Sequence, residues 1–170
     1  FARYYAHCAE ALYEVRNATF TPDRVVLVTP PWNFPIAIPT GGIAASLAAG
    51  SAVIVKPAPQ VVHCGKLVVE AFRTALEAQG LDPDLVQLVL TDEAAAGKAL
   101  LSHDDVDNVI LTGASDTGAL FRSWKPKMNI MAETSGKNAL IITPAADPDL
   151  AIDDLYNSAF GHSGQKCSAA

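Results

Sequence analysis

RVVLVTPPWNFPIAIPTGGIAASLAAGSAVIVK, residues 24–56, holds two short apolar runs separated by a segment of small residues. The first run, RVVLVTPP, predicts a strand that Pro30 and Pro31 end, because proline has no N–H to donate to a β-ladder. Residues 35–50 predict a tightly packed helix, and Gly50 is a natural stop for it. The run SAVIVK is continuously apolar, as expected of a strand buried on both faces. The stretch therefore predicts a strand, a helix and a second strand in succession.

The rest of the chain continues this alternation. The hydrophobic spacing predicts helices over residues 1–16, 62–79, 93–102, 115–123 and 148–160, and strands over residues 85–90, 106–112, 128–133 and 138–143. Helices that alternate with unbroken apolar strands predict an α/β fold, an open, mostly parallel, doubly wound Rossmann-like sheet. In such sheets ligands bind beyond the carboxyl ends of the strands, so chemistry is expected at the strand-to-helix junctions.

Composition and charge restrict the class of protein. Half of the 170 residues are hydrophobic, enough for one globular core, and the net charge of −6 argues against a nucleic-acid surface. No apolar run reaches the roughly 18 residues that would predict a membrane span. The three cysteines form no CxxC pair and no metal-ligand spacing, which predicts no metal site and a reducing, cytoplasmic compartment. The chain starts without Met or a signal peptide, and both ends look cut, so we expect a piece of a longer protein.

Three junctions carry residues suited to binding a nucleotide or an oxyanion. In TPPWNFP, Asn33 is either a structural turn residue or an amide donor to a developing oxyanion. In VKPAP, Lys56 is either a solvated strand end or a donor to ribose hydroxyls. In LTGASDTG, Gly113 and Gly118 bracket the start of a helix whose N–H groups suit a pyrophosphate, although a plain turn explains the pattern equally well. The motif is neither a Walker A loop nor a G-x-G-x-x-G fingerprint.

Two further stretches carry candidate catalytic residues. Glu133, in AETSGKN, is either a loop residue or a general base in a partly desolvated mouth. Cys167, in FGHSGQKCSAA, is either an inert core thiol or a nucleophile. Its polar neighbours argue against the core, and the adjacent Lys166 favours the thiolate. Gly161 and Gly164 in the same stretch let the backbone turn sharply.

Taken together and in this order, PWNFP, KPAP, LTGAS…G, AETSGKN and GQKCSA resemble the signature motifs of the aldehyde dehydrogenase superfamily. The likeness runs over nearly the whole chain. AETSGKNALI and GHSGQKCSAA are most similar to the branch that oxidises glutamate γ-semialdehyde. That branch comprises the pyrroline-5-carboxylate dehydrogenases and the matching module of bifunctional proline utilisation A proteins.

The resemblance implies a role for each motif residue. Cys167 would be the nucleophile, Glu133 the base that activates the deacylating water, and Asn33, with the Cys167 N–H, the oxyanion hole. For NAD or NADP it implies a binding set of Trp32, Lys56, Pro59, Gly113, Ser115, Gly118 and Thr134. For the substrate carboxylate it implies Lys166 and Ser168. Pro59 stands where many NAD-using members have a ribose-binding Glu, and Ala114 where Ser is usual. Both departures leave the choice between NAD and NADP open.

The resemblance also implies a division into domains and an activity for the whole protein. Residues 1–160 would form the NAD(P)-binding domain, with 1–23 as a leading helix and linker, and residues 161–170 would begin the catalytic domain. The whole protein would oxidise glutamate γ-semialdehyde to glutamate in proline catabolism and form a homo-oligomer, with fusion to a proline dehydrogenase domain left open. The chain alone is expected to be inactive.

Three alternatives remain open. The first is a non-catalytic nucleotide-binding or interaction module in which Cys167 is a bystander. The second is a cysteine acyl-transfer hydrolase without a redox cofactor. Lys56 and the glycine turn favour redox chemistry over hydrolysis, because a hydrolase needs no ribose site. The third is oxidation of a different aldehyde.

Overall fold

The computed structural model describes residues 1–92 and 94–170, and the chain forms two compact units, Phe1–Thr134 and Ser135–Ala170. The predicted division into residues 1–160 and 161–170 concerns functional domains rather than compact units, and it stays a prediction. Among the described residues, no helix is both long enough and apolar enough to cross a membrane.

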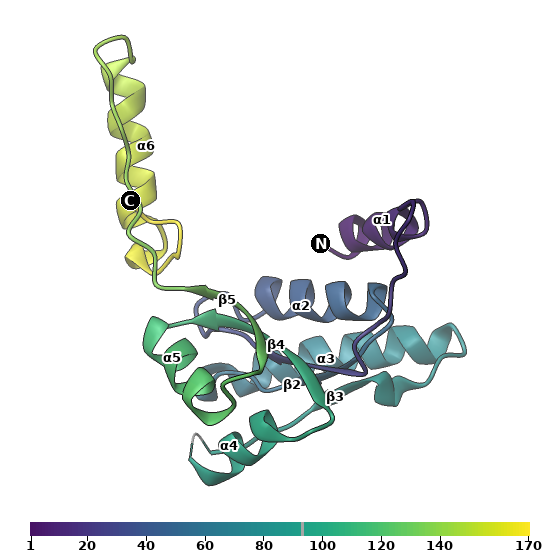
Figure 1. Ribbon diagram of the computed structural model, residues 1–170. Coiled ribbons are helices and arrows are strands. Elements are labelled where there is room, and N and C mark those ends of the chain that lie inside the picture. The colour runs from purple at the N-terminus through teal and green to yellow at the C-terminus, as the bar shows by residue number, and fades with distance from the viewer. Residues whose placement is uncertain (93) are drawn as a thin grey trace. The chain divides into compact units, whose positions relative to one another are not determined.

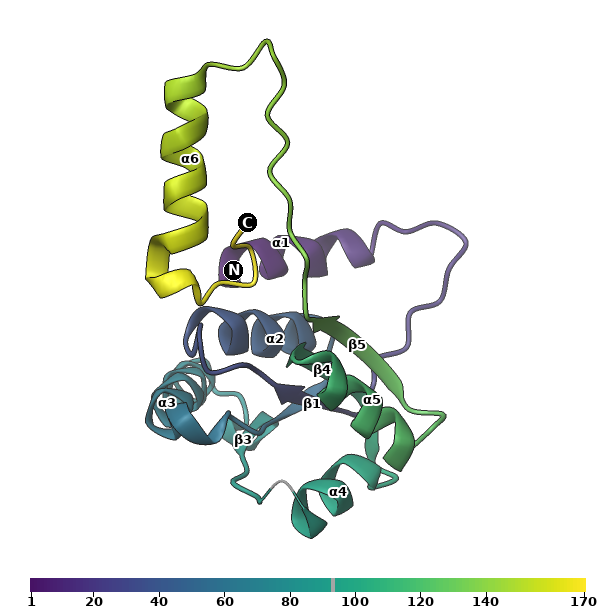
Figure 2. The same cartoon turned by 90° about the vertical axis from the view of Figure 1, so that its left-hand side faces the viewer.

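The first unit is built on a five-stranded parallel sheet with the order β3-β2-β1-β4-β5. Its strands are labelled across Figure 1 and Figure 2. Its strands are β1 Val25–Thr29, β2 Ala52–Val55, β3 Val86–Leu88, β4 Val106–Gly113 and β5 Asn129–Thr134. From β1 the chain winds outward through β2 to β3, and then returns to the other side of β1 to add β4 and β5. The switch point of the sheet therefore lies between β1 and β4. The predicted doubly wound parallel sheet is confirmed.

Helices cover both faces of this sheet (Figure 2). The helices of the unit are α1 Ala2–Leu12, α2 Ala37–Ala48, α3 Val62–Ala78, α4 Ala95–Ser102 and α5 Ser115–Trp124. α2 and α3 pack on one face, α4 and α5 on the other, and α1 lies beside α2. All five were predicted, although α1 ends at Leu12 rather than at residue 16. The predicted helix 93–102 is confirmed from Ala95, and residue 93 lies outside the described residues.

Alternate side chains of the strands fill two separate apolar cores. Val26 and Val28 of β1 face α2 and α3, while Leu27 between them faces α4 and α5. All three are almost completely buried. Because a strand side chain alternates between the faces, a strand covered on both sides needs an unbroken apolar run, as residues 25–28 show.

The small residues of α2 let the helix lie close to β1. A Cβ added at Gly42 would lie 2.8 Å from Val28 Cγ1, closer than real side chains approach. The helix ends at Ala48, and Gly50 then takes a φ of +85°, which a residue with a side chain rarely adopts. The predicted stop at Gly50 is thus confirmed.

A β-bulge interrupts β4 near its amino end. In the register of β1 against β4, one step along Val25–Val26 matches two steps of β4, so Asp107 is an extra residue. Val106 and Val109 consequently pack in the same core although they are three positions apart. The bulge was not predicted from the sequence.

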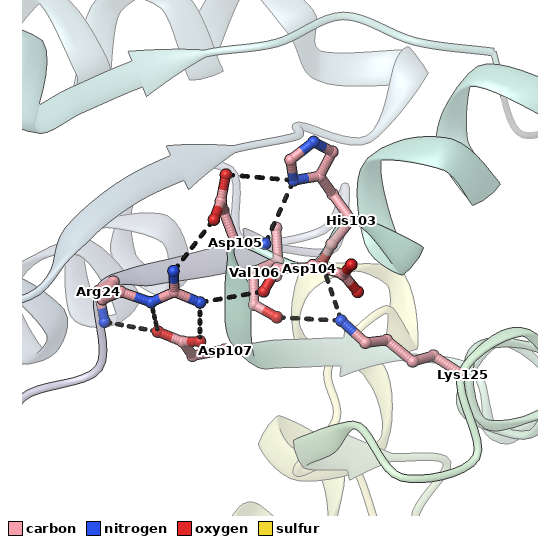
Figure 3. A network of polar contacts seen from close by, with 7 residues as sticks. All are labelled: Arg24, His103, Asp104, Asp105, Val106, Asp107 and Lys125. Atoms are coloured by element: carbon pink, nitrogen blue, oxygen red, sulfur yellow. Dashed lines mark hydrogen bonds and ion pairs between the residues drawn. The ribbon is translucent and has the colours of Figure 1, made fainter.

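Arg24 holds this bulge from the residue before β1 (Figure 3). Its main-chain N–H, Nε and Nη2 donate to the Asp107 carboxylate at 2.7, 3.1 and 2.8 Å. Nη1 donates to Asp105 and Nη2 to the Asp104 carbonyl, both at 3.0 Å. Lys125 Nζ donates to two main-chain carbonyls of the same segment, at 2.8 and 3.3 Å. The network ties β1 to β4 at the amino edge of the sheet, opposite the edge where chemistry is expected.

The second unit consists of an extended segment, helix α6 (Pro148–Phe160) and a returning C-terminal turn (Figure 1). Asp147 caps α6, and its Oδ1 accepts from the N–H groups of Asp149 and Leu150 at 3.0 and 3.2 Å. The predicted strand over residues 138–143 is wrong. This segment forms no β-ladder with any described strand, and its Ile141 side chain is 86% exposed.

Candidate functional site

The carboxyl ends of the parallel strands bring four of the candidate motifs to one edge of the first unit. Lys56 directly follows β2, and its main-chain N–H still donates to Val28 O at 2.9 Å. Glu133 pairs with Thr112 near the end of β4, and Thr134 pairs with Gly113. The segment that follows β1 and contains Asn33 starts at the same edge, because β1 is parallel to both of its neighbours. In the first unit these junctions therefore lie at one edge of the sheet.

Lys56 and Glu133 lie at opposite sides of this edge. Two strands, β1 and β4, separate β2 from β5. Three inter-strand spacings of about 4.8 Å place the two residues about 14 Å apart. Lys56 is half-buried and Glu133 is exposed. The two side chains are therefore placed to serve different parts of an extended ligand.

The β1 junction places Asn33 between a strand end and the start of a helix. Thr29, which ends β1, is buried, and its Oγ1 donates to the Ile110 carbonyl of β4 at 3.2 Å. Helical bonding begins one residue after Asn33, where Phe34 O accepts from the N–H of Ile38 at 3.4 Å. Asn33 itself is half-buried, and Trp32 beside it is 44% exposed. The prolines and the helix start thus hold Asn33 beside the switch point.

The β4 junction has features of an anion site. No side chain caps α5 at Ala114, and a helix start carries N–H groups without partners inside the helix. The helix also packs closely on the sheet, since a Cβ at Gly118 would lie 3.6 Å from Leu111 and 3.8 Å from Thr134. The exposed Asp116 in the first turn opposes an anion. This turn is therefore a weaker phosphate site than a loop closed by lysine.

Among the described strands, β5, which carries Glu133, lies at the edge of the sheet and has a neighbour on one side only. Its side chain is exposed within the first unit. The partly desolvated mouth expected around this carboxylate is not formed by the first unit itself, so it stays a prediction.

In the second unit, Cys167 lies in an exposed turn that folds back along α6. The reversal uses three successive residues with positive φ, namely His162 and Ser163 at 55° and Gly164 at 69°. Gly161 and Gly164 were both predicted to let the backbone turn sharply; Gly164 takes a positive φ, whereas Gly161 takes an ordinary φ of −56°. Two non-glycine residues thus carry left-handed conformations just before the nucleophile candidate.

The Cys167 turn is held by hydrogen bonds from both sides. Asn138 Nδ2 donates to the carbonyls of Cys167 and Ala169 at 2.6 and 2.9 Å. From the other side, Lys166 Nζ donates to Asn157 O at 3.0 Å, and the Ala170 N–H donates to a serine hydroxyl of α6 at 3.1 Å. Sequence reasoning missed Asn138, although it lies within the quoted motif AETSGKN.

Lys166 already has a local partner. It is half-buried against the end of α6, and a Cβ at Gly161 would lie 3.0 Å from its Nζ. Ser168 is exposed. The predicted carboxylate-binding role of these two residues stays a prediction. Across residues 1–92 and 94–170, no group of three His, Cys, Asp or Glu residues could hold a metal ion.

Comparison with known proteins places these motifs in a family context. Residues 2–170 match the family model described as aldehyde dehydrogenase family. An N-succinylglutamate 5-semialdehyde dehydrogenase of Paraburkholderia xenovorans (strain LB400) is 38% identical over 152 residues, which is 88% of this chain and 30% of that protein. A 1-pyrroline-5-carboxylate dehydrogenase of Bacillus pumilus (strain SAFR-032) is 34% identical over 164 residues, 92% of this chain and 31% of that protein.

Solved structures agree with the sequence comparison. Proline utilization A (PutA) from Corynebacterium freiburgense is 62% identical, with a TM-score of 0.91, over 99% of this chain and 17% of that chain. An NADP-dependent glyceraldehyde-3-phosphate dehydrogenase from Bacillus halodurans C-125, complexed with NADP, is 27% identical, with a TM-score of 0.85, over 99% and 38%. The chain therefore spans less than a third of the two curated relatives and a sixth or so of the PutA chain.

Proposed function

The chain belongs to the aldehyde dehydrogenase family, and from this premise we propose that the whole protein oxidises an aldehyde to a carboxylate with NAD or NADP. In this proposal the first unit binds the dinucleotide and the second supplies the thiol. The observation that carries it is the convergence of four family motifs at one edge of a doubly wound sheet. A non-catalytic module would need no such arrangement of Asn33, Lys56 and Glu133.

The first unit fits a dinucleotide. Its switch point lies between β1 and β4, Lys56 stands at the end of β2, and the start of α5 has no side-chain cap. When bound, the nicotinamide would supply a hydride acceptor, which no side chain can replace. The residues proposed to hold the dinucleotide are Trp32, Lys56, Pro59, Gly113, Ser115, Gly118 and Thr134. The structural neighbour complexed with NADP supports dinucleotide use without favouring NAD or NADP here.

The side chains then divide the chemistry. The Cys167 thiolate attacks the aldehyde carbon, forming a C–S bond and moving the carbonyl electron pair onto oxygen. The Asn33 amide and the Cys167 N–H donate to this oxyanion. After the carbon has lost its hydride, a thioester remains on Cys167. Glu133 takes a proton from water, the water oxygen attacks the thioester carbon, and the C–S bond breaks to release the thiolate and the carboxylic acid, which gives up its remaining proton to solvent.

We propose L-glutamate γ-semialdehyde as the substrate and proline catabolism as the setting. The 1-pyrroline-5-carboxylate dehydrogenase relative and the 62% identical PutA support this choice. The likeness to PutA also supports fusion to a proline dehydrogenase domain, and a homo-oligomeric state is proposed from the family. A second candidate, N-succinylglutamate 5-semialdehyde, is favoured by the 38% identical relative. Both substrates present a carboxylate, for which Lys166 and Ser168 are the proposed partners.

The test is an assay of NADH and NADPH formation by the whole protein with glutamate γ-semialdehyde, N-succinylglutamate 5-semialdehyde and propanal. We expect the highest kcat/KM with glutamate γ-semialdehyde. Changing Lys166 and Ser168 together to Ala should lower that value roughly tenfold to a hundredfold, as for the loss of a charge-assisted hydrogen bond, and spare propanal. Equal losses on both substrates would remove the carboxylate role. Failure to form NADH or NADPH with any aldehyde would refute the proposed function.

A further inference from the structure

The side chain of Asn138 contacts the main chain on both sides of the Cys167–Ser168–Ala169 stretch. Its Nδ2 donates to Cys167 O at 2.6 Å and to Ala169 O at 2.9 Å. Both partners are carbonyl oxygens, which only accept hydrogen bonds, so the nitrogen of the amide and not its oxygen must face the turn. The two N–H bonds of Asn138 are matched to two acceptors. From this geometry we propose that Asn138 is a positioning residue for the Cys167 nucleophile, an inference that rests on the proposed function.

Both peptide planes that flank Cys167 are restrained. The peptide before it is held through Lys166 O, which accepts from the N–H of Ala169 at 3.1 Å. The peptide after it is held through Cys167 O by Asn138. Because these two planes set the direction of the Cα–Cβ bond, they also set the point from which Sγ approaches a substrate. The plane before Cys167 carries its N–H, the proposed oxyanion donor.

The segment that contains Asn138 lies close to the turn because it contains a glycine. A Cβ at Gly136 would lie 3.5 Å from Cys167 O and 3.4 Å from Asn138 Oδ1, which leaves little room for a side chain. The same motif carries Glu133, five residues before Asn138. One short stretch thus supplies both the proposed base and the side chain that holds the nucleophile turn.

Hydrogen bonds are needed in this turn because its backbone conformation is unfavourable. His162 and Ser163, which lead into it, hold left-handed backbone conformations that are unfavourable for residues with side chains. Hydrogen bonds that Lys166 and Ala170, on the far side of the turn, donate to α6 offset part of this cost. Asn138 is the side chain that contacts Cys167 itself among the hydrogen bonds found in the described residues.

The test compares Asn138→Ala with a matched Asn157→Ala variant in the whole protein. Asn157 takes part through its main-chain carbonyl, which the substitution leaves in place. We expect Asn138→Ala to lower kcat roughly tenfold to a hundredfold, the scale on which a nucleophile displaced by about 1 Å loses rate. The Kd for the dinucleotide and the Tm should stay at wild-type values. Asn157→Ala should leave all three quantities unchanged.

Amide hydrogen exchange of residues 165–170 gives a readout that does not depend on activity. We expect faster exchange there in Asn138→Ala and not in Asn157→Ala. Asn138→Gln, which keeps the NH₂ group, should recover part of kcat, and the isosteric Asn138→Asp should not. A kcat for Asn138→Ala within twofold of wild type, or unchanged exchange, would overturn the proposal.

The same measurements separate this inference from the proposed function. A wild-type protein that oxidises no aldehyde would refute the function, while the exchange data would still decide whether Asn138 holds the turn. Loss of dinucleotide binding and Tm together with kcat in the Asn138 variants would show a general structural role and contradict positioning.

Discussion

At the residue scale, the Asp107 carboxylate accepts hydrogen bonds from Arg24 at the bulge, where the ladder between β1 and β4 is interrupted. The Arg24 guanidinium, and then its main-chain N–H, lower the pKa of the Asp107 carboxyl from its ordinary value of 3.8 to about 2. The ionised carboxylate is thus favoured in the folded state. A depressed folded pKa stabilises the protein above the unfolded pKa, and this contribution disappears as the pH falls through the folded value.

This linkage predicts a pH-dependent effect of Asp107→Asn. The difference in urea midpoint between wild type and Asp107→Asn should be constant above about pH 5 and should shrink as the pH falls from about 4 to about 2. Asp153→Asn, at an exposed position of α6, serves as the control and should show little difference at any pH. A difference for Asp107→Asn that persists unchanged at pH 2 would contradict the pairing with Arg24.

Substitutions of Cys167 and Glu133 are expected to block different steps of the reaction. In the whole protein, Cys167→Ala should abolish hydride transfer, because no thiohemiacetal can form. Glu133→Gln keeps the shape but cannot accept a proton from water, so acylation should survive better than deacylation. General-base assistance is worth about 10²–10⁴-fold, enough to expose a burst of NADH near one per active site when aldehyde and NAD⁺ are mixed rapidly.

The burst also distinguishes two roles for Glu133. If the base additionally helps to ionise Cys167, the burst itself should slow in Glu133→Gln, and raising the pH should restore it. Unchanged steady-state turnover in Glu133→Gln would show that Glu133 is a loop residue.

The motifs made Cys167, Glu133, Asn33 and Lys56 predictable as candidates, because each stands at a strand or loop end rich in turn residues. Asn138 was not predictable in the same way. Its partners are main-chain carbonyls 29 and 31 residues further along the chain. A main-chain acceptor has no residue type, so no sequence pattern identifies it.

At the element scale, the buried strands were predictable, whereas the β-bulge of β4 and the absence of a strand over residues 138–143 were not. Residues 25–28 are apolar throughout because both faces are covered, and this pattern is visible in the sequence. Residues 139–142 are also an unbroken apolar run, yet residues 138–143 form no strand, because a strand also needs a neighbouring strand for its hydrogen bonds. The bulge at Asp107 depends on Arg24, which lies 83 residues earlier in the chain.

The close packing of α2 on β1 gives a prediction with an adjacent control. Gly42→Ala would place a Cβ 2.8 Å from Val28 Cγ1, and overpacking of this kind typically costs about 1–3 kcal/mol. Gly41→Ala meets only Phe1, at 3.9 Å, so it should be neutral or stabilising through the higher helix propensity of Ala. Urea denaturation of both variants gives the comparison. Equal effects of the two substitutions would contradict the contact between α2 and β1.

At the scale of the whole molecule, the order of elements was enough to predict the doubly wound sheet. Strand order in a parallel α/β sheet follows from right-handed crossovers and from covering both faces, so few arrangements remain. The division after Thr134 was not predicted, because the apolar run of residues 139–142 follows soon after residues 128–133 and predicted one more strand. Compactness depends on which segments contact one another, and periodicity carries no information about that.

The exposed apolar side chains of the second unit lead to a prediction for the 170-residue chain on its own. Ile141 is 86% exposed and Phe160 68%, with Leu150 and Ile152 also exposed on α6. Such a surface promotes association in water. We therefore expect the isolated chain to self-associate, with an apparent mass in sedimentation that rises with concentration. Changing Ile141 and Phe160 to polar residues should reduce this association, whereas changing Leu67 of α3, which is 58% exposed as a single position on a charged helix, should not.

The isolated chain is also expected to form no NADH with any aldehyde, because it spans 30% and 31% of the two dehydrogenase relatives and 17% of the PutA chain. The Cys167→Ala chain provides the background rate. The polar double variant at Ile141 and Phe160 separates two causes of inactivity, since a monodisperse but inactive chain would show that self-association is not responsible. Steady-state NADH formation above the Cys167→Ala background would instead show that residues 1–170 contain a complete catalytic set.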